Sequence, residues 1–196
     1  ISLYKISQYA VTPFLGTYQN KELGFSLTVV SALGALYSVV RSLCSRPIGR
    51  LADKTSFSRM LQLCFLLEAL AYLSLVFTGG AFGQAAFVVY KVLNAISMAG
   101  INSGCINLVY DYVAPDRRVG ALALQNTVAG AAGFLTTLGA SAIVDHIQAS
   151  GNLVFGIPMY AQQALSLFSA LICLVIVAYL HGVVERSQRA ASSDIA

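Results

Sequence analysis

The chain has 196 residues, of which 57% are hydrophobic and only 10% are charged, and its mean hydropathy is +0.73. Because about a quarter of the residues of a soluble domain are charged, this composition excludes an ordinary soluble protein and indicates a bilayer environment. The net charge of +4 comes from twelve basic residues that are spread along the chain without a basic stripe, so we expect no nucleic-acid binding.

Six apolar stretches, separated by breaks of Gly, Pro and charge, are the predicted membrane spans. They cover residues 1–18, 24–45, 57–78, 84–113, 119–144 and 160–184. The chain opens inside the first stretch with no signal peptide, so we interpret this span as truncated and the N-terminus as missing. A longer loop is expected over 145–158 and a polar cytoplasmic tail over 186–196.

The basic residues fall in alternate loops of this topology. They are Arg46, Arg50, Lys54 and Arg59 after the second span, Arg117 and Arg118 after the fourth, and Arg186 and Arg189 in the tail. The opposite loops hold almost nothing basic except Lys21. Since positively charged loops stay in the cytoplasm, we expect an integral protein of the inner or plasma membrane, with these loops and the C-terminus cytoplasmic.

The cysteines and histidines show no metal-ligand spacing. The four cysteines lie within or at the end of apolar stretches, and we interpret them as small packing residues: Cys44, Cys64, Cys105 and Cys173. His146 and His181 lie at span ends, without a carboxylate or thiol at ligand spacing. We therefore expect no metal, no other cofactor and no disulfide.

The stretch from Gly49 to Arg59, Gly-Arg-Leu-Ala-Asp-Lys-Thr-Ser-Phe-Ser-Arg, joins the second and third predicted spans. It resembles the G-x-L-A-D-R/K-x-G-R/K-R/K signature of the major facilitator superfamily, which that family places at this point of a six-helix repeat. Ser56 stands where a second glycine is usual, and only Arg59 remains of the terminal basic cluster. A second stretch, from Asp111 to Gly120, is similar to the P-x-x-R-G/A turn that the family places between helices four and five or ten and eleven.

Roles at the ends of helices also explain several residues of these two motifs. Gly49 suits a tight exit from the second span, because glycine alone tolerates a positive φ. Thr55 or Ser56 is positioned to cap the third span. Pro115 ends the fourth span, and Asp116 is positioned to cap the fifth. A purely structural explanation of the second motif thus stands beside the resemblance.

The resemblance implies an all-α polytopic membrane protein, in which residues 1–185 are six transmembrane helices that form one half of a major-facilitator-type fold. The departures at the signature and the tail after the sixth span favour the C-terminal half, helices seven to twelve. Such a half works by alternating access around a central site. The implied partners are membrane lipid, a missing N-terminal half or a second copy, and a small solute with or without coupling to protons.

The resemblance also implies a cytoplasmic gate. Asp53 would hold that side shut by contacting the N-terminus of the fifth span near Arg118. The alternative is a solvated loop whose charges only set the topology. Arg41 and Asp111, near cytoplasmic helix ends, are either a gate pair or surface anchors. The predicted gate and signature residues are Gly49, Asp53, Lys54, Arg59, Arg41, Asp111 and Arg118.

Lys5, Gln8, Tyr9 and Thr12 form a polar stripe on the first span, at spacings i, i+3, i+4 and i+7. Polar and ionisable groups inside a membrane helix are functional candidates because their insertion is costly. In the family that this chain resembles, helix seven lines the cavity, so this stripe is the first prediction for the substrate path. The alternative is that truncation leaves Lys5 near the interface, where its amine reaches water.

Further polar residues lie within the third, fourth and fifth spans. Glu68 and Lys91 fall at comparable depths, and we predict an intramembrane charge pair between them. We prefer pairing to proton coupling for Glu68, because the corresponding helix of the family is peripheral. Lys91 and Asn94, one turn apart, are predicted cavity residues. Gln125 and Asn126, about two turns from the cytoplasmic end of the fifth span, are predictions for the pathway or gate.

The leading function is secondary active transport of a small solute by alternating access, with this chain as one half of the transporter. The alternative within that class is a proton-driven drug or metabolite efflux antiporter. The alternative of another class is a non-transporting membrane scaffold or receptor, for which only the 145–158 loop offers much surface. No GxSxG, HExxH or paired-aspartate constellation occurs in the spans, so we expect no enzyme and no catalytic residue.

Overall fold

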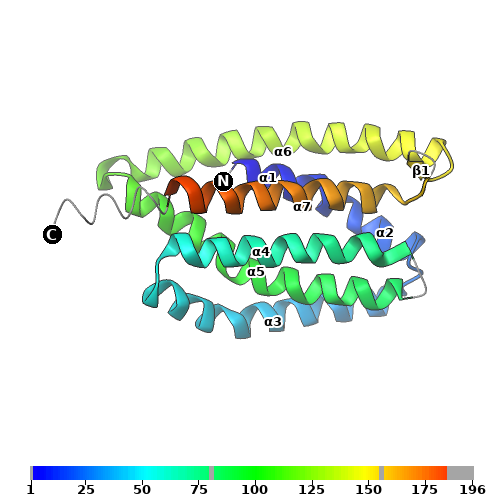
Figure 1. Cartoon of the computed structure of the whole chain (residues 1–196), viewed down its shortest axis with the longest axis horizontal. Coiled ribbons are helices and arrows are strands. Elements are labelled where there is room, and N and C mark those ends of the chain that lie inside the picture. The colour runs from blue at the N-terminus through cyan, green and yellow to red at the C-terminus, as the bar shows by residue number, and fades with distance from the viewer. Residues whose placement is uncertain (1, 80–81, 155–156, 185–196) are drawn as a thin grey trace.

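The computed structural model describes residues 2–79, 82–154 and 157–184, and in these ranges the chain is a bundle of helices that run along one long axis (Figure 1). The main helices are α1 (Ser2–Val11), α2 (Leu15–Lys21), α3 (Leu27–Lys54), α4 (Phe57–Val76), α5 (Gly83–Tyr112), α6 (Arg118–Ala149) and α7 (Ala161–Tyr179). Shorter elements are 3-10 turns at Thr12–Phe14, Phe77–Gly79 and Pro115–Arg117, a π turn at Leu180–Val184, and a hairpin of β1 (Leu153–Val154) and β2 (Ile157–Pro158).

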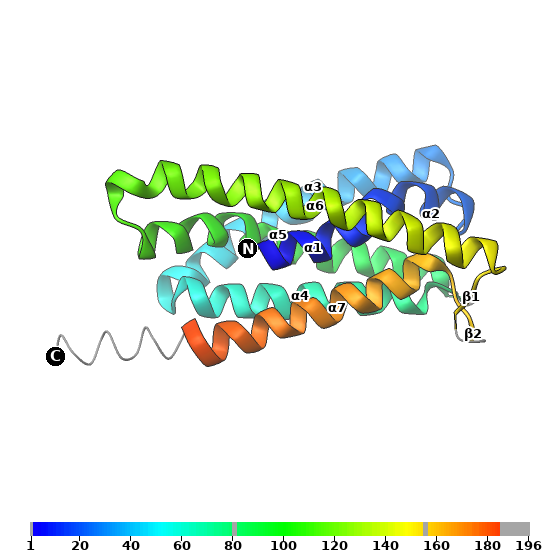
Figure 2. The ribbon, with the colours of Figure 1, turned by 90° about the horizontal axis from the view of Figure 1, so that it is seen from above.

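Five helical stretches of the described residues are long and apolar enough to cross a membrane. They are Leu27–Lys54, Phe57–Gly79, Gly83–Asn107, Pro115–Ala149 and Ala161–Gly182. The segment predicted as the first span is broken into α1 and α2, which follow one another along the bundle (Figures 1 and 2). The prediction of an all-α fold built from membrane-spanning helices is confirmed, with one of the six segments discontinuous.

The break in the first segment follows from Pro13, which has no backbone N–H to donate to the carbonyl four residues earlier. The next turn tightens, and the N–H of Leu15 bonds to the Thr12 carbonyl instead of continuing the α-helical ladder. Side chains of other helices bond to the carbonyls released in this way. Thr137 Oγ1 of α6 lies 3.4 Å from the Tyr9 carbonyl oxygen, and Gln162 Nε2 of α7 donates to the Val11 carbonyl over 3.2 Å.

The helix α3 extends beyond its predicted end. It continues through Pro47 and Gly49 to Lys54, whereas the sequence predicted its end at residue 45. Gly49 is helical, and among the described glycines only Gly24 and Gly151 have a positive φ, so the predicted tight exit at Gly49 is wrong. Arg46 and Arg50 beside it are good helix formers, and one proline removes only one ladder bond, so the helix persists past the apolar stretch.

Ser56 then starts α4 as predicted. Its Oγ accepts a hydrogen bond from the backbone N–H of Arg59 over 3.2 Å, which satisfies one of the donors at the helix N-terminus. The Thr55 hydroxyl instead donates back to the Leu51 carbonyl at the end of α3. The connection between the two helices therefore consists only of Thr55 and Ser56.

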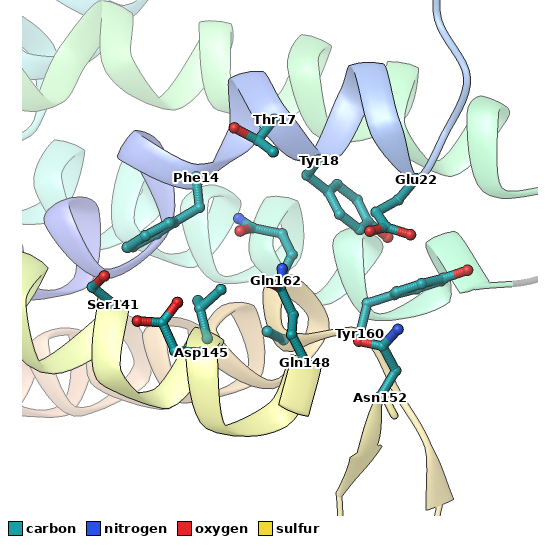
Figure 3. A pocket seen from close by; sticks show the side chains of 12 residues that line it. Phe14, Thr17, Tyr18, Glu22, Ser141, Asp145, Gln148, Asn152, Tyr160 and Gln162 are labelled. Atoms are coloured by element: carbon teal, nitrogen blue, oxygen red, sulfur yellow. The ribbon is translucent and has the colours of Figure 1, made fainter. Parts of the chain in front are cut away.

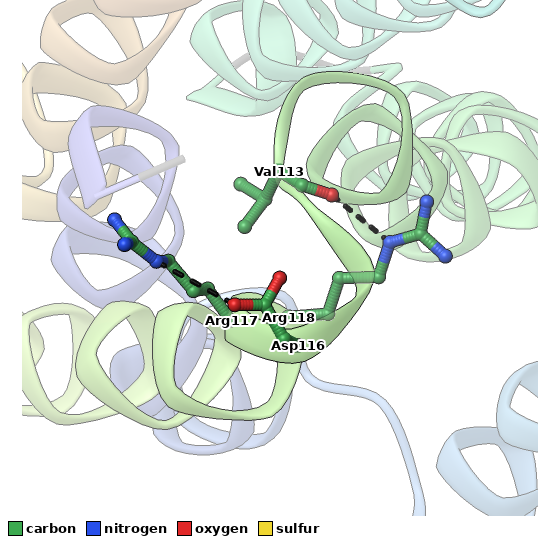
Figure 4. Close-up of polar contacts among 4 residues, drawn as sticks. All are labelled: Val113, Asp116, Arg117 and Arg118. Atoms are coloured by element: carbon green, nitrogen blue, oxygen red, sulfur yellow. Dashed lines mark hydrogen bonds and ion pairs between the residues drawn. The ribbon is translucent and has the colours of Figure 1, made fainter.

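The α5–α6 connection differs from the prediction at Asp116. The first residue flanking α6 is Arg117, and no side chain caps it. Asp116 lies in the preceding 3-10 turn and its carboxylate is 3.7 Å from Arg117 Nε, with both side chains largely exposed (Figure 4). An exposed pair of this kind adds little stability.

The predicted loop over 145–158 is shorter than expected, because α6 continues to Ala149. The chain then turns through Gly151 and Asn152, at φ values of 74° and 61°, into the β1–β2 hairpin. In that hairpin Leu153 pairs with Pro158 and Val154 with Ile157. The α3–α4 and α5–α6 connections lie together at the opposite end of the bundle (Figures 1 and 2). The two basic loops therefore share one end.

The core lies around α4, which packs against α5 and α7 and buries side chains from Ser58 to Leu75. Where α5 approaches α4, a Cβ on Gly100 would lie 2.6 Å from the Cys64 sulfur, and one on Gly104 would lie 2.7 Å from Met60 Cε. Glycine at these positions permits the close approach. Helices α3 and α6 are much less covered: α3 buries Leu33 and Ala52, and α6 buries Ala129, Gly133, Ala140 and Ile147.

Candidate functional site

A pocket of about 200 Å³ lies between the first segment, α3 and α5. We call it the inner pocket, and its lining residues are Gln8, Thr12, Leu15, Gly34, Tyr37, Tyr90, Lys91, Asn94 and Met98. Four residues predicted for the substrate path thus come together here from two helical segments: Gln8, Thr12, Lys91 and Asn94. Tyr37 and Tyr90 add hydroxyl groups that the sequence did not single out.

The other two members of the predicted stripe do not line the inner pocket. Lys5 is half-buried, donates from Nζ to Gln8 Oε1 over 2.9 Å, and lies 5.6 Å from the centroid of the Tyr4 ring. Tyr9 packs on α6, because a Cβ on Gly133 would lie 2.7 Å from Tyr9 Cδ2. Adjacent helical residues point about 100° apart, so Gln8 and Tyr9 face different neighbours.

Glu68 is fully buried on α4, and its carboxylate is held by neutral groups, two of them on α5 and one, Tyr72, on α4 itself. Asn94 Nδ2 donates to Glu68 Oε1 over 2.7 Å, and the Ser97 hydroxyl donates to Oε2. Lys91 Nζ lies over the Phe87 ring, 5.6 Å from its centroid. The predicted Glu68–Lys91 ion pair is therefore not formed, because amide and hydroxyl donors occupy the carboxylate. Ser97, which lies one turn after Asn94, was missed by the sequence reasoning.

Asn94 joins two parts of the structure. Its side chain lines the inner pocket and also donates to the buried Glu68 carboxylate. A carboxylate on α4, a helix that contributes nothing to the pocket lining, is therefore one hydrogen bond away from the pocket. Gln125 and Asn126 do not join this arrangement: Gln125 is half-buried and Asn126 exposed on α6, and neither lines the inner pocket.

The predicted gate residues are spread over the end of the bundle. Arg118 Nε donates to the Val113 carbonyl over 3.0 Å (Figure 4). Its Nη2 donates to the Tyr110 carbonyl over 2.8 Å, and the two bonds together cap the end of α5. The guanidinium also lies 5.0 Å from the centroid of the Tyr110 ring. Asp53 is exposed on the last turn of α3 and forms no ion pair with Arg118. An Asp53–Arg118 ion pair is thus not formed, because the backbone of α5 holds the guanidinium.

The remaining gate predictions have diverse surroundings. Gly49 and Lys54 are exposed on α3. Arg41 is half-buried there and interacts with Tyr37, one turn away, so it adjoins the inner pocket. Arg59 is exposed at the start of α4, where its backbone N–H meets the Ser56 cap. The side chain of Asp111 lies outside the described part of the structure.

A second pocket, of about 230 Å³, lies at the other end of the bundle between the first segment, α6 and the start of α7 (Figure 3). We call it the outer pocket, and its lining residues are Phe14, Thr17, Tyr18, Glu22, Ser141, Val144, Asp145, Gln148, Asn152, Tyr160, Ala161 and Gln162. The sequence reasoning predicted none of them as site residues. The available signal was the polar run from Tyr160 to Gln163 at the start of an otherwise apolar span.

Comparison with known proteins gives one match. The family model described as Major Facilitator Superfamily matches residues 2–194, which includes both motif stretches and nearly the whole chain. No curated protein and no solved structure matches. The apolar helices, the polar pocket between them and this match agree in describing an integral membrane protein of a transporter family. The chain belongs to the Major Facilitator Superfamily.

Proposed function

We propose that the protein is a secondary active transporter that moves a small solute by alternating access. The inner pocket is the observation that carries this proposal, because it gathers Gln8, Thr12, Lys91 and Asn94 between apolar helices. A charged or polar group inside a membrane helix is costly to insert, so a cluster of them around a cavity is typical of a solute pathway. Its volume of about 200 Å³ suits a small solute or part of a larger one.

We also propose that this chain supplies the C-terminal six-helix half, helices seven to twelve, and that its partner is an N-terminal half or a second copy. The support for a partner is the uncovered surface of α3 and α6, the two helices with the fewest buried residues for their length. Both present large apolar side chains outward: Val39 and Leu43 on α3, and Leu124, Phe134 and Leu135 on α6. A second half packed beside the inner pocket would cover part of these faces, and lipid the rest.

Proton-driven antiport is the second candidate, and one contact favours it. Asn94 connects the buried Glu68 carboxylate to the inner pocket. The ionised Glu68 carboxylate can only accept hydrogen bonds from Asn94. After it takes up a proton, it would become a carboxylic acid that can also donate one. Solute binding in the pocket and proton binding at Glu68 would then be coupled through a single amide.

The proposal is tested by uptake into proteoliposomes across a panel of small solutes, with and without a pH gradient. We expect vectorial uptake of at least one solute class, and a loss of about tenfold or more in Asn94→Val. Asn102→Val is the matched control, since Asn102 lies on the same helix but is exposed and outside the pocket. For the antiport version, Glu68→Gln should abolish the dependence on the gradient.

Three outcomes would count against these proposals. Equal loss of uptake in Asn94→Val and Asn102→Val would remove the inner pocket from the pathway. Binding of solutes without uptake of any of them would favour a receptor or scaffold. Turnover of a solute to a covalent product without vectorial movement would reject transport altogether.

A further inference from the structure

Lys91 brings a positive charge to the inner pocket. Among the described residues that line this pocket, Lys91 is the only charged one, and none is acidic. It lies eight residues after Gly83, the first residue of α5, which is about 12 Å along the helix axis. A lysine at that depth of a membrane-spanning helix is costly to insert unless its charge is compensated.

The described part of the chain supplies no anion to Lys91. Its ammonium group lies 5.6 Å from the centroid of the Phe87 ring and forms no ion pair with the described residues. Glu68 is one hydrogen bond behind the pocket, but its oxygens already accept hydrogen bonds from neutral groups of α4 and α5. A ring face attracts a cation without neutralising it. The charge of Lys91 is therefore left for an anion that the described chain does not contain.

Two further cations lie one contact behind the lining. Lys5 Nζ donates to Oε1 of the lining residue Gln8 over 2.9 Å. Arg41 interacts with the lining residue Tyr37, one turn away on α3. In and directly behind the wall there are thus three cations and a single carboxylate, that of Glu68. The charges of the described residues therefore make the potential in the inner pocket positive.

Neutral groups of the lining can also donate hydrogen bonds to an anion. Because Gln8 Oε1 accepts from Lys5, the polar atom that Gln8 keeps free is Nε2, which is a donor. The Tyr90 hydroxyl forms no hydrogen bond with the described residues, although Tyr90 is only 3% exposed. A carboxylate accepts several hydrogen bonds and binds charged donors most strongly. An ammonium group with an amide and a hydroxyl beside it therefore matches a carboxylate.

We infer that the solute of the inner pocket is a small organic anion whose carboxylate pairs with the Lys91 ammonium group. Leu15 and Met98 supply apolar wall for the body of such a solute. The cavity of about 200 Å³ is several times the volume that one water occupies in the liquid, so it has room for more than the carboxylate alone. This inference rests on the proposed function, because it names the class of solute that the transporter binds.

The first test compares pairs of solutes that have nearly the same shape and differ in charge. The intact protein, purified in a non-ionic detergent, is titrated calorimetrically with succinate and succinamide, with lactate and lactamide, and with benzoate and benzamide. We expect at least one carboxylate to bind, and its amide to bind about tenfold or more weakly. If no carboxylate of this panel binds more tightly than its amide, the inference is overturned.

Variants of the lysine locate the charge. Lys91→Met removes the ammonium group but keeps an unbranched side chain, and it should weaken carboxylate binding about tenfold or more. Lys91→Arg keeps the charge and should retain most of the preference for the carboxylate. Lys21→Met is the matched control, because Lys21 is exposed at the end of α2 and lies outside the pocket, and it should change nothing. Far-UV circular dichroism checks that each variant is folded.

Two results from the variants would overturn the inference. Unchanged carboxylate binding in Lys91→Met would show that this ammonium group is not the partner of the anion. Equal losses in Lys91→Met and Lys21→Met would show that the overall charge of the protein, and not this pocket, governs the binding.

Binding and uptake together separate this inference from the transport proposal. Carboxylate binding that depends on Lys91, without uptake of that solute into proteoliposomes, would reject transport and support the anion site. Uptake of neutral or cationic solutes without any preference for carboxylates would support transport and overturn the anion site.

Discussion

The carboxylate of Glu68 is an ionisable group buried within a membrane-spanning helix, and its partners are an amide and hydroxyl groups instead of a cation. This arrangement satisfies the acceptor without burying a second charge, whose desolvation is costly. Ser97 also has a second acceptor, the Asn94 carbonyl, 2.9 Å away. The contact between α4 and α5 therefore depends more on Asn94 than on Ser97.

Replacement of Glu68 by leucine should destabilise the protein by about 1–3 kcal/mol, because the Asn94 amide loses its acceptor in a partly buried position. Glu68→Gln keeps one oxygen facing Asn94 and should cost clearly less. Thermal unfolding in detergent, followed by far-UV circular dichroism, measures the difference between the two variants. Indistinguishable unfolding of both variants and the parent would mean that this carboxylate does not stabilise the α4–α5 contact.

Residue spacing predicted part of the inner pocket and none of the outer one. Gln8 and Thr12 repeat at i and i+4, and Lys91 and Asn94 at i and i+3, so each pair lies on one helical face whatever the tertiary fold. That the two faces meet is a property of the packing, which the sequence does not contain. Asp145, Glu22 and Gln162 come from three separate elements, so no local pattern joins them.

At the scale of single elements, the sequence located the helices better than their ends. Hydropathy falls after residue 45, but α3 continues to Lys54 because a helix entering water needs no apolar residues, only good helix formers. The same reason extends α6 to Ala149. The family signature therefore lies mostly on a helix, with only the Thr55–Ser56 region as a connection.

The α4–α5 connection gives an element-scale prediction at Gly83, the first residue of α5. A Cβ there would collide with the Thr78 carbonyl oxygen, a backbone atom that cannot rotate away. We expect Gly83→Ala to lower the free energy of unfolding by about 1–3 kcal/mol.

Gly120→Ala is the matched control, because Gly120 lies near the start of α6 and has no atom within 4 Å of an added Cβ. It should be neutral or stabilise by up to about 1 kcal/mol, since alanine is the better helix former. The measurement is again thermal unfolding of both variants beside the parent protein. A stable Gly83→Ala variant would imply that the connection relaxes at little cost.

At the scale of the whole molecule, composition and hydropathy were enough to predict the all-α membrane architecture, since only a helix satisfies its own backbone in hydrocarbon. Composition and hydropathy could not predict the broken first segment. Pro13 alone does not reveal whether other helices will bond to the backbone carbonyls that the proline leaves unpaired. The predicted topology also required the two basic loops to share an end, and they do.

The orientation of the bundle is testable with single-cysteine reporters. Cys44 is replaced, because the other three thiols are buried, and reporters are placed at the exposed residues Lys54 and Ala149. Positive loops stay in the cytoplasm, so a membrane-impermeant maleimide should label Ala149→Cys in intact cells and Lys54→Cys only after permeabilisation. The reverse pattern would invert the proposed orientation and place the outer pocket on the cytoplasmic side.

Pro13 lines neither pocket, yet it decides how the side-chain amide of Gln162 is bonded. An unbroken helix would draw the Val11 carbonyl into its own ladder, and the amide on α7 would lose the partner that holds it one way round. The orientation of a buried amide on one helix thus depends on a backbone irregularity in another segment. A substitution at Pro13 would therefore alter the contact between the first segment and α7.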